Sequence, residues 1–272
     1  MIDQVIVPLD GSEHADRALR PAIEVARRLD ASVALLRAIH PDDVDVAQQE
    51  LSSRRDEHEP PGAELVIDTI RGPVSAIAAF VAERPNSLVC MTTHGRSGLT
   101  RAFLGSVAEE ALREVDVPFL LVGPQYVGGT GLGSCVIAPV DGSHRSEAVL
   151  PLALEWAHRL EVPLWVVTVV DPAKMAKASS SESDFQEDIY VRRLASSLPS
   201  GGREVEWEVL HDADPATGIT DFTEARHGGL VVMATHGRSG LSRVALGSVA
   251  SRVVREHSGL TLVTRSADLS DG

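Results

Sequence analysis

The sequence predicts an α/β protein made of two tandem domains, each with a doubly wound, five-stranded parallel sheet. Two stretches occur twice along the 272 residues. A strand-like run ends in Pro-x-Asp-Gly-Ser in both places, and the glycine-spaced segment MTTHGRSGLTRAFLGSVA returns as MATHGRSGLSRVALGSVA. Between these motifs, short apolar runs alternate with helical patterns. Strands that are apolar on both faces are typical of a parallel sheet that helices cover on two sides.

The spacing of the repeated motifs shows that the second copy is longer than the first. Asp10 and Asp141, at the same place in the two Asp-Gly-Ser motifs, are 131 residues apart, whereas Gly95 and Gly237 in the two loops are 142 apart. The second copy is therefore 11 residues longer, the difference between 142 and 131. We place the additional residues in the polar stretch 174–188 and expect a flexible excursion there.

Glycines mark the boundary between the two copies. The stretch GPQYVGGTGLGS separates the last strand-like run of the first copy from the first run of the second. Such a composition is typical of a linker. We predict a first domain at 1–124, a linker at 125–134 and a second domain at 135–268, and each domain has an ordinary size.

The elements of each copy follow from its hydrophobic pattern. β-branched residues before Pro8 indicate the first strand, and apolar residues from Ala15 to Leu29 share one face of a helix. The further elements predicted for the first copy are strand 32–39, a polar helix, strand 63–70, helix 74–83, strand 87–92, a helix from Ser106 and strand 117–123. In the second copy they are strands 163–170, 204–210, 229–234 and 260–265, with helices at 217–225 and from Ser248.

Composition argues against several classes of protein. The net charge of −14 at pH 7 disfavours a nucleic-acid surface, because phosphate backbones are held mainly by Lys and Arg. No apolar run reaches the roughly 18 residues of a membrane span, and the N-terminal sequence resembles a strand more than a signal peptide. We therefore expect a cytoplasmic protein. Cys90 and Cys135 lack partners at metal-ligand spacing and are expected to be small buried hydrophobic residues.

The repeated loop combines features of an anion site. In each copy it follows a predicted strand, and nine residues separate a glycine from a Gly-Ser pair. We expect the serine to cap the next helix and the small residues to let the backbone approach a ligand. The free N–H groups at the helix start favour an anion. The residues concerned are Gly95, Gly105 and Ser106 in the first copy, and Gly237, Gly247 and Ser248 in the second.

An acidic residue is predicted at the same sheet edge as each loop. Asp10 and Asp141 end the first strands, and ligands of open parallel sheets bind beyond the carboxyl ends of the strands. An acid opposite an anion site suits a nucleotide, with the acid at sugar hydroxyl or base amino groups and the loop at the phosphates. Each motif alone is often only a turn and a helix cap. Their joint recurrence in both copies favours a ligand site.

The motifs VPLDGS and APVDGS and the two loops resemble those of the universal stress protein family over essentially the whole chain. The resemblance implies a Rossmann-like sheet, of the adenine nucleotide alpha hydrolase type, with strand order 3-2-1-4-5. It also implies bound ATP, with Mg²⁺ held through the phosphates and not by protein ligands. The residues that it assigns to the nucleotide are Asp10 and Asp141 at the adenosine, Ala38 and Val169 at the adenine, and Gly95, Gly105, Ser106, Gly237, Gly247 and Ser248 at the phosphates, with Val107 and Val249 beside them.

One position departs from the family pattern. Thr92 and Ala234 stand where the family has the first glycine of the loop motif, beside the ribose. A side chain there either crowds the sugar or is accommodated. Polar residues inside the loops are also open to two interpretations, contact with phosphate or support of the loop itself. These residues are His94, Arg96, His236 and Arg238.

We predict an ATP-binding stress or dormancy regulator with little or no catalytic turnover. No residue is placed as a general base for ATP hydrolysis, and no catalytic residue is assigned. The alternative is a stress protein that binds no nucleotide and acts through protein–protein interaction; a weak ATPase is less favoured. The expected partners are an adenine nucleotide, a second tandem chain in a homodimer and a regulatory protein.

Overall fold

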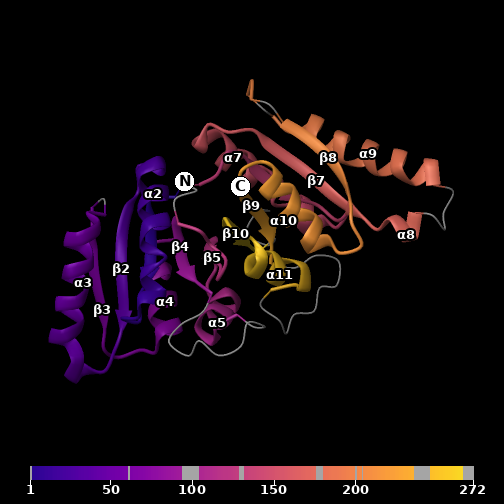
Figure 1. The fold of residues 1–272 in the computed structure, drawn as a ribbon. Helices are drawn as coiled ribbons and strands as arrows, with labels where there is room; N and C mark the ends of the chain where they lie inside the picture. Colours follow the sequence, from indigo (N-terminus) through magenta and orange to yellow (C-terminus); the bar gives the residue numbers. More distant parts are fainter. Residues whose placement is uncertain are drawn as a thin grey trace. The chain divides into compact units, whose positions relative to one another are not determined.

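The computed structural model describes residues 2–60, 62–93, 104–128, 132–175, 180–199, 201–203, 205–235 and 246–265 (Figure 1). The chain divides into two compact units, Met1–Pro124 and Gln125–Gly272. Each unit contains one copy of the repeated motifs, and each is described separately below.

The first unit alternates strands and helices. Its elements are β1 (Gln4–Pro8), α1 (Glu13–Asp16), α2 (Leu19–Leu29), β2 (Ser32–Ala38), a 3-10 turn (Pro41–Asp43), α3 (Val44–His58), β3 (Glu64–Asp68), α4 (Pro73–Ala82), β4 (Ser87–Thr92), α5 (Ser106–Glu114) and β5 (Phe119–Val122). The predicted apolar helix 15–29 is thus two helices, because the chain turns at Arg17 and Ala18. Its apolar face is buried from Ala15 to Leu29, as the pattern indicates.

The second unit repeats this order with one additional helix. Its elements are β6 (Val136–Pro139), α6 (His144–Glu147), α7 (Leu150–Leu160), β7 (Leu164–Val170), α8 (Pro172–Met175), α9 (Ser180–Ser197), β8 (Val205–His211), α10 (Pro215–Ala225), β9 (Leu230–Ala234), α11 (Ser248–Glu256) and β10 (Leu260–Thr264). The flexible excursion predicted at 174–188 is therefore wrong for residues 180–188, which form the first half of α9. A polar composition suits a helix on the surface of a sheet as well as it suits a loop.

Both units have parallel strands in the predicted order. The order is β3-β2-β1-β4-β5 in the first unit and β8-β7-β6-β9-β10 in the second. The paired strands within each unit run parallel. The fold class and the order 3-2-1-4-5 are confirmed.

The strand order creates a switch point in each sheet. The chain moves outward in one direction from β1 to β2 and β3, then returns and moves outward in the other direction through β4 and β5. Because the crossovers between parallel strands are right-handed, the helices of the two directions cover opposite faces. The carboxyl ends of β1 and β4 therefore flank a crevice, and those of β6 and β9 do so in the second unit. Such a crevice is where doubly wound sheets bind ligands.

The core of each unit lies along its first strand. Val5, Ile6 and Val7 of β1 are completely buried, as are Val136, Ile137 and Ala138 of β6. Strands buried on both faces read as continuous apolar runs, which is why these strands were recognisable in the sequence.

The residues predicted as a linker belong to the second unit. The backbone N–H of Val127 donates to the carbonyl of Ser258 over 3.1 Å, and that of Ser134 donates to the carbonyl of Gly228 over 3.3 Å. Both ends of the segment are thus bonded to the unit that follows it.

A search for membrane spans gave a negative result. Within the ranges that the structure describes, no helix has both the length and the apolar character needed to cross a bilayer.

Candidate functional site

The Asp-Gly-Ser motif of the first unit forms a tight turn directly after β1. Oδ1 of Asp10 accepts hydrogen bonds from the backbone N–H of Ser12 at 2.9 Å and from its hydroxyl at 2.6 Å. Ser12 Oγ in turn accepts from the N–H of Ala15 at 3.2 Å and so caps α1. Gly11 has φ +82°, a left-handed conformation that glycine adopts without strain. The turn fixes the Asp10 carboxylate at the carboxyl edge of the sheet.

The second unit builds the same turn with the same atoms. Asp141 Oδ1 accepts from the N–H of Ser143 at 3.1 Å and from its hydroxyl at 2.6 Å, and Gly142 has φ +79°. Ser143 caps α6 by accepting from the N–H of Ser146 at 3.2 Å. The predicted adenosine-binding acids therefore have matching geometry in the two units.

A backbone hydrogen bond joins the described ends of each repeated loop. The N–H of Gly105 donates to the carbonyl of Thr93 at 2.5 Å, and that of Gly247 donates to the carbonyl of Thr235 at 2.6 Å. Thr93 and Thr235 directly follow β4 and β9. Each loop thus leaves its strand and returns to the same point of the sheet edge, where the next helix begins.

The helix starts differ from the prediction by one residue. Gly105 and Gly247 are the N-caps of α5 and α11, and within the described residues neither helix has a side-chain cap. Ser106 and Ser248 are the first helical residues and are exposed, so their expected role as N-caps is wrong. Val107 and Val249 follow in the first turn. A helix without a capping side chain leaves its first N–H groups to water or to a ligand, which suits an anion.

The strand register brings the acids and the loop ends to the same level. In the first unit Gln4, Val5 and Ile6 pair with Ser87, Leu88 and Val89. Continuing this register along the two strands sets Asp10 beside Thr93. In the second unit, Val136 and Ile137 pair with Leu230 and Val231, and the same continuation sets Asp141 beside Thr235. The acid and the closed end of the loop therefore lie at the carboxyl edge of two neighbouring strands in each unit.

Two of the predicted site residues lie outside the described part of the chain, and two others lie at strand ends. Gly95 and Gly237 lie outside the described residues, as do the loop residues at 94, 96, 236 and 238. Ala38 and Val169 end or nearly end β2 and β7, at matching places on the sheet edge. The structure thus places the described candidates at one edge of each sheet, and their contact with a nucleotide stays a prediction.

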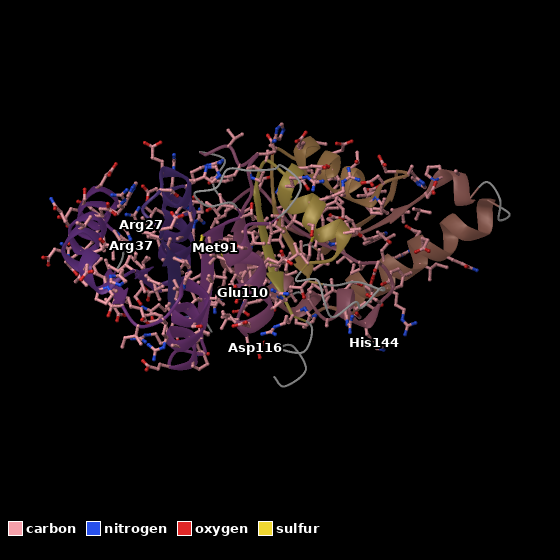
Figure 2. All side chains as sticks on the ribbon, turned by 90° about the horizontal axis from the view of Figure 1, so that it is seen from below. Arg27, Arg37, Met91, Glu110, Asp116 and His144 are labelled. Carbon is pink, nitrogen blue, oxygen red and sulfur yellow. The ribbon has the colours of Figure 1, made fainter. Side chains whose placement is uncertain are left out.

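Sequence reasoning missed a buried arginine beside the first acid. Arg37 of β2, labelled in Figure 2, is only 8 % exposed. It forms an ion pair with Glu50 of α3. A Cβ atom on Gly11 would lie 2.7 Å from its Nη2, so the guanidinium covers the Asp-Gly-Ser turn. The signal was present in the sequence, because Arg37 is the one charged residue within the apolar run SVALLRAI. The matching residue of β7 is Thr168.

In the second unit a tyrosine lies near the corresponding turn. The hydroxyl of Tyr190, from α9, donates to Oε1 of Glu147 at 2.9 Å. Burial and the neighbouring Glu147 raise the pKa of this phenol, so it stays protonated. In the first unit the matching acid, Asp16, instead forms an ion pair with Arg54 of α3 at 2.9 Å. The two sites therefore share the acid and the loop but differ in the side chains that surround them.

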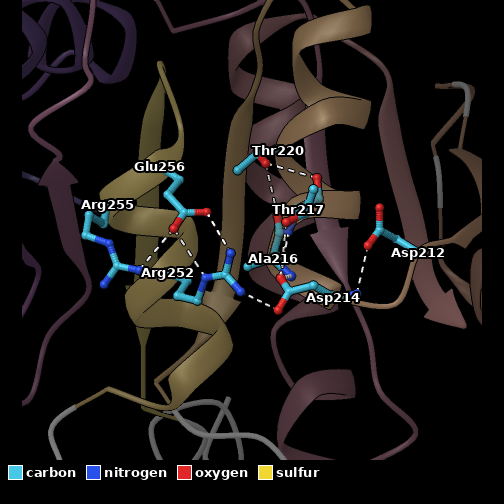
Figure 3. A network of polar contacts seen from close by, with 8 residues as sticks. All are labelled: Asp212, Asp214, Ala216, Thr217, Thr220, Arg252, Arg255 and Glu256. Atoms are coloured by element: carbon cyan, nitrogen blue, oxygen red, sulfur yellow. Dashed lines mark hydrogen bonds and ion pairs between the residues drawn. The ribbon is translucent and has the colours of Figure 1, made fainter. Parts of the chain in front are cut away.

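A network of charges joins α10 to α11 in the second unit (Figure 3). Asp214 is the N-cap of α10 and accepts from the N–H groups of Ala216 and Thr217, both at 3.1 Å. Arg252 of α11 forms an ion pair with Asp214 and a second one with Glu256 at 3.1 Å. The hydrogen bond from Thr217 and the charge of Arg252 lower the pKa of Asp214.

The described residues were searched for clusters of side chains that could bind a metal ion. Among them, no group of three or more His, Cys, Asp or Glu side chains could hold a metal. The arrangement of each site instead suits an anionic ligand with a polar group that reaches the acid.

Comparisons with known proteins agree with this geometry. The model of the universal stress protein family matches residues 1–123 and 135–265. A universal stress protein of Methanocaldococcus jannaschii is 30% identical over 135 residues, which cover 47% of this chain and 79% of that protein. One of Mycolicibacterium smegmatis is 25% identical over 96% of both chains. The crystal structure of a universal stress protein from Archaeoglobus fulgidus has the same fold, with TM-score 0.71, 18% identity and coverage of 97% of both chains. The chain therefore belongs to the universal stress protein family, and both of its units are copies of the family domain.

Proposed function

We propose that each unit binds an adenine nucleotide at its switch point, and that the chain is a nucleotide-dependent stress or dormancy regulator with little or no turnover. One observation carries this proposal. In both units an acid, Asp10 or Asp141, and the closed end of the loop that leads into the next helix come from the carboxyl ends of two neighbouring strands. Family membership supports the same interpretation, since the family includes a nucleotide-binding branch.

The roles of the residues follow from their chemistry. The carboxylates of Asp10 and Asp141 accept hydrogen bonds from the ribose or the base, and the strand ends at Ala38 and Val169 offer backbone groups to the adenine. The first N–H groups of α5 and α11 bind phosphate oxygens. We propose ATP as the nucleotide, with Mg²⁺ held by the phosphates, because Mg²⁺ commonly binds through substrate phosphates.

The exposed first residue of each helix gives a sharp test. Because Ser106 makes no cap bond, Ser106→Asp adds a negative charge where it stabilises the helix and repels a phosphate. The double variant Ser106→Asp/Ser248→Asp is expected to lose at least about tenfold in ATP affinity by calorimetric titration, and to keep or raise its unfolding temperature. Ser106→Ala/Ser248→Ala is the control and should bind nearly as the parent does. Equal binding by the aspartate variant would contradict the assignment of the phosphates to these helices.

A second candidate function rests on Thr92 and Ala234. Both residues carry a side chain where the family motif has glycine, and Thr92 is partly exposed at the end of β4. If these side chains exclude the ribose, the protein acts through protein–protein contacts instead. Thr92→Gly/Ala234→Gly decides between the two, because it would create ATP binding only if the side chains were the obstacle. A weak ATPase would show steady phosphate release that disappears in the Ser106→Asp/Ser248→Asp variant.

We further propose that the protein works in the cytoplasm, as a homodimer of tandem chains, with a regulatory protein as its partner. Occupancy of the sites would change the surface that this partner binds. Sedimentation with and without ATP measures the oligomeric part of this proposal.

A further inference from the structure

Charged side chains differ between the two phosphate-binding helices, although their first turns are almost identical. Both helices begin Ser-Val-Ala, and the next two residues are Glu109 and Glu110 in α5 but Ser251 and Arg252 in α11. Over their whole length, α5 carries three glutamates and one arginine, whereas α11 carries one glutamate and two arginines. Glu110 and Arg252 occupy the same position of the repeat, 142 residues apart.

The side chain of Arg252 brings its charge to the sheet edge. Its guanidinium forms an ion pair with Asp214, which is the N-cap of α10 (Figure 3). N-caps lie at the end of a helix nearest to the carboxyl ends of the strands in this fold. The cation is therefore held at the level of the helix starts, where the phosphates of the proposed nucleotide would lie, although Arg252 itself belongs to the second turn.

The first unit has no counterpart of this arrangement among its described residues. The residue that matches Asp214 is Gly72, and no side chain caps α4. The residue that matches Arg252 is Glu110, which carries the opposite charge. Long helical side chains extend toward the N-terminus of their helix, so Glu110 extends toward the start of α5.

Nearby opposite charges reduce the difference in net charge between the surroundings of α5 and α11 but do not remove it. In the second unit, Asp214 and Glu256 offset the two arginines of α11, and Asp212 adds one further negative charge nearby. In the first unit, Arg113 offsets only one of the three glutamates of α5. The turn after β3 there contributes Arg71 and Asp68, which pair with each other. Among the groups named, three glutamates and one arginine give −2 for α5, and two arginines with three acids give −1 for α11 and its neighbours, so the surroundings of α5 are more negative by one charge.

We infer that the two sites are not equivalent: the second unit prefers nucleotides with more phosphate charge, and the first unit prefers less charged ones. This inference rests on the proposed function and adds that the two sites of one chain prefer different nucleotides. A repulsion between Glu110 and a phosphate grows with the number of phosphate charges, whereas it leaves an uncharged nucleoside unaffected. ATP is therefore expected mainly in the second unit, and a nucleoside monophosphate competes best in the first.

The test measures ATP, AMP and adenosine binding by calorimetry on the full chain with one site blocked. Ser248→Asp leaves the first site to be measured, and Ser106→Asp leaves the second. The ratio of ATP affinity to AMP affinity is expected to be at least about threefold higher at the second site in low salt, and the difference should shrink at 1 M salt.

Charge variants assign the difference to the residues named. Glu110→Gln should raise ATP affinity at the first site by about threefold and leave adenosine affinity unchanged, whereas Glu114→Gln, a turn further from the helix start, should change it less. Arg252→Gln should lower ATP affinity at the second site by a similar factor, more than Arg255→Gln does. Thermal unfolding of each variant shows that the chain remains folded.

Three results would overturn the inference. Equal ATP-to-AMP ratios at the two sites would contradict it while leaving the proposed function intact, and so would a Glu110→Gln variant with an unchanged ratio. Absence of binding by all three ligands at both sites, in the unmodified chain as well, would overturn the proposed function and this inference together.

Discussion

Among single residues, His257 links the stability of the second unit to pH. Its ring is only 1 % exposed, and Nε2 lies 3.0 Å from the carbonyl of Gly229. Within the described residues, Nδ1 is buried and has no hydrogen-bond partner. Burial lowers the pKa of the imidazole, and the bond to Gly229 offsets only part of that effect. A second N–H on this ring would have no acceptor, so the folded chain disfavours protonation.

The lowered pKa of His257 makes the stability of the second unit fall in acid. Because the pKa of His257 is lower in the folded chain than the ordinary value of 6.5, the unfolded chain takes up the proton first. This contribution to stability is complete above that value and is lost as the pH falls below it. His257→Val copies Val115, the matching residue of the first unit. Its free energy of unfolding by urea should fall less between pH 7 and pH 5 than that of the parent. The exposed His144 supplies the control, since His144→Gln should keep the parental slope; an unchanged slope in His257→Val would contradict the account.

Arg37 is the second residue whose environment has a measurable consequence. Its buried guanidinium pairs with Glu50, whose side chain is 34% exposed. Removing the carboxylate leaves a buried cation with one partner fewer, so Glu50→Gln should lower the free energy of unfolding by about 2 kcal/mol. The pair of Arg84 with Glu83 is a surface contact, the glutamate being 79% exposed. Glu83→Gln should therefore cost less than about 0.5 kcal/mol. Urea titrations measure both losses. Equal losses of unfolding free energy in the two variants would contradict this account, because burial of Arg37 would then add nothing to the contribution of its ion pair.

At the scale of elements, α4 and α10, the helices that follow the third strand of each unit, begin in different ways. The N-cap of α10 is Asp214, which bonds two backbone N–H groups, whereas the N-cap of α4 is Gly72, without a capping side chain. Asp214→Ala should lower the free energy of unfolding by about 1 kcal/mol. Gly72→Asp should raise it by about 0.5 kcal/mol, because Gly72 has extended backbone dihedrals and nothing lies within 4 Å of an added Cβ. Differential scanning calorimetry measures both; a destabilising Gly72→Asp would contradict the cap geometry.

The elements also show which signals the sequence carried. Apolar runs such as those of β1 and β6 predict buried parallel strands directly, since their residues are buried on both faces. Residues 180–188 could not be recognised in the same way. They are mostly polar, and α9 as a whole lies against β8 and β7, a tertiary contact that a sequence pattern does not reveal. The one-residue error at Ser106 has a similar origin, because Gly-Ser fits both a glycine cap and a serine cap.

For the whole molecule, the repeat made the fold predictable and concealed the differences between the sites. Matching motifs 131 and 142 residues apart predicted two domains with one strand order. Because the motifs match so closely, they also predicted two similar sites. Arg37 and Glu110 differ from Thr168 and Arg252, and their effect appears only when the fold brings β2, α3 and α5 to the sheet edge. Single charges in a helical pattern look like ordinary surface residues until their neighbours are known.

The central claim, that both units bind an adenine nucleotide, is tested most directly by the ligand that the protein retains. The purified chain would be denatured, and the released small molecules identified and counted by chromatography and mass spectrometry, with ATP added back before a parallel measurement. The account predicts adenine nucleotides, up to two per chain after ATP is added back, one for each unit. A chain that releases no nucleotide and retains none after saturation with ATP and magnesium would contradict it.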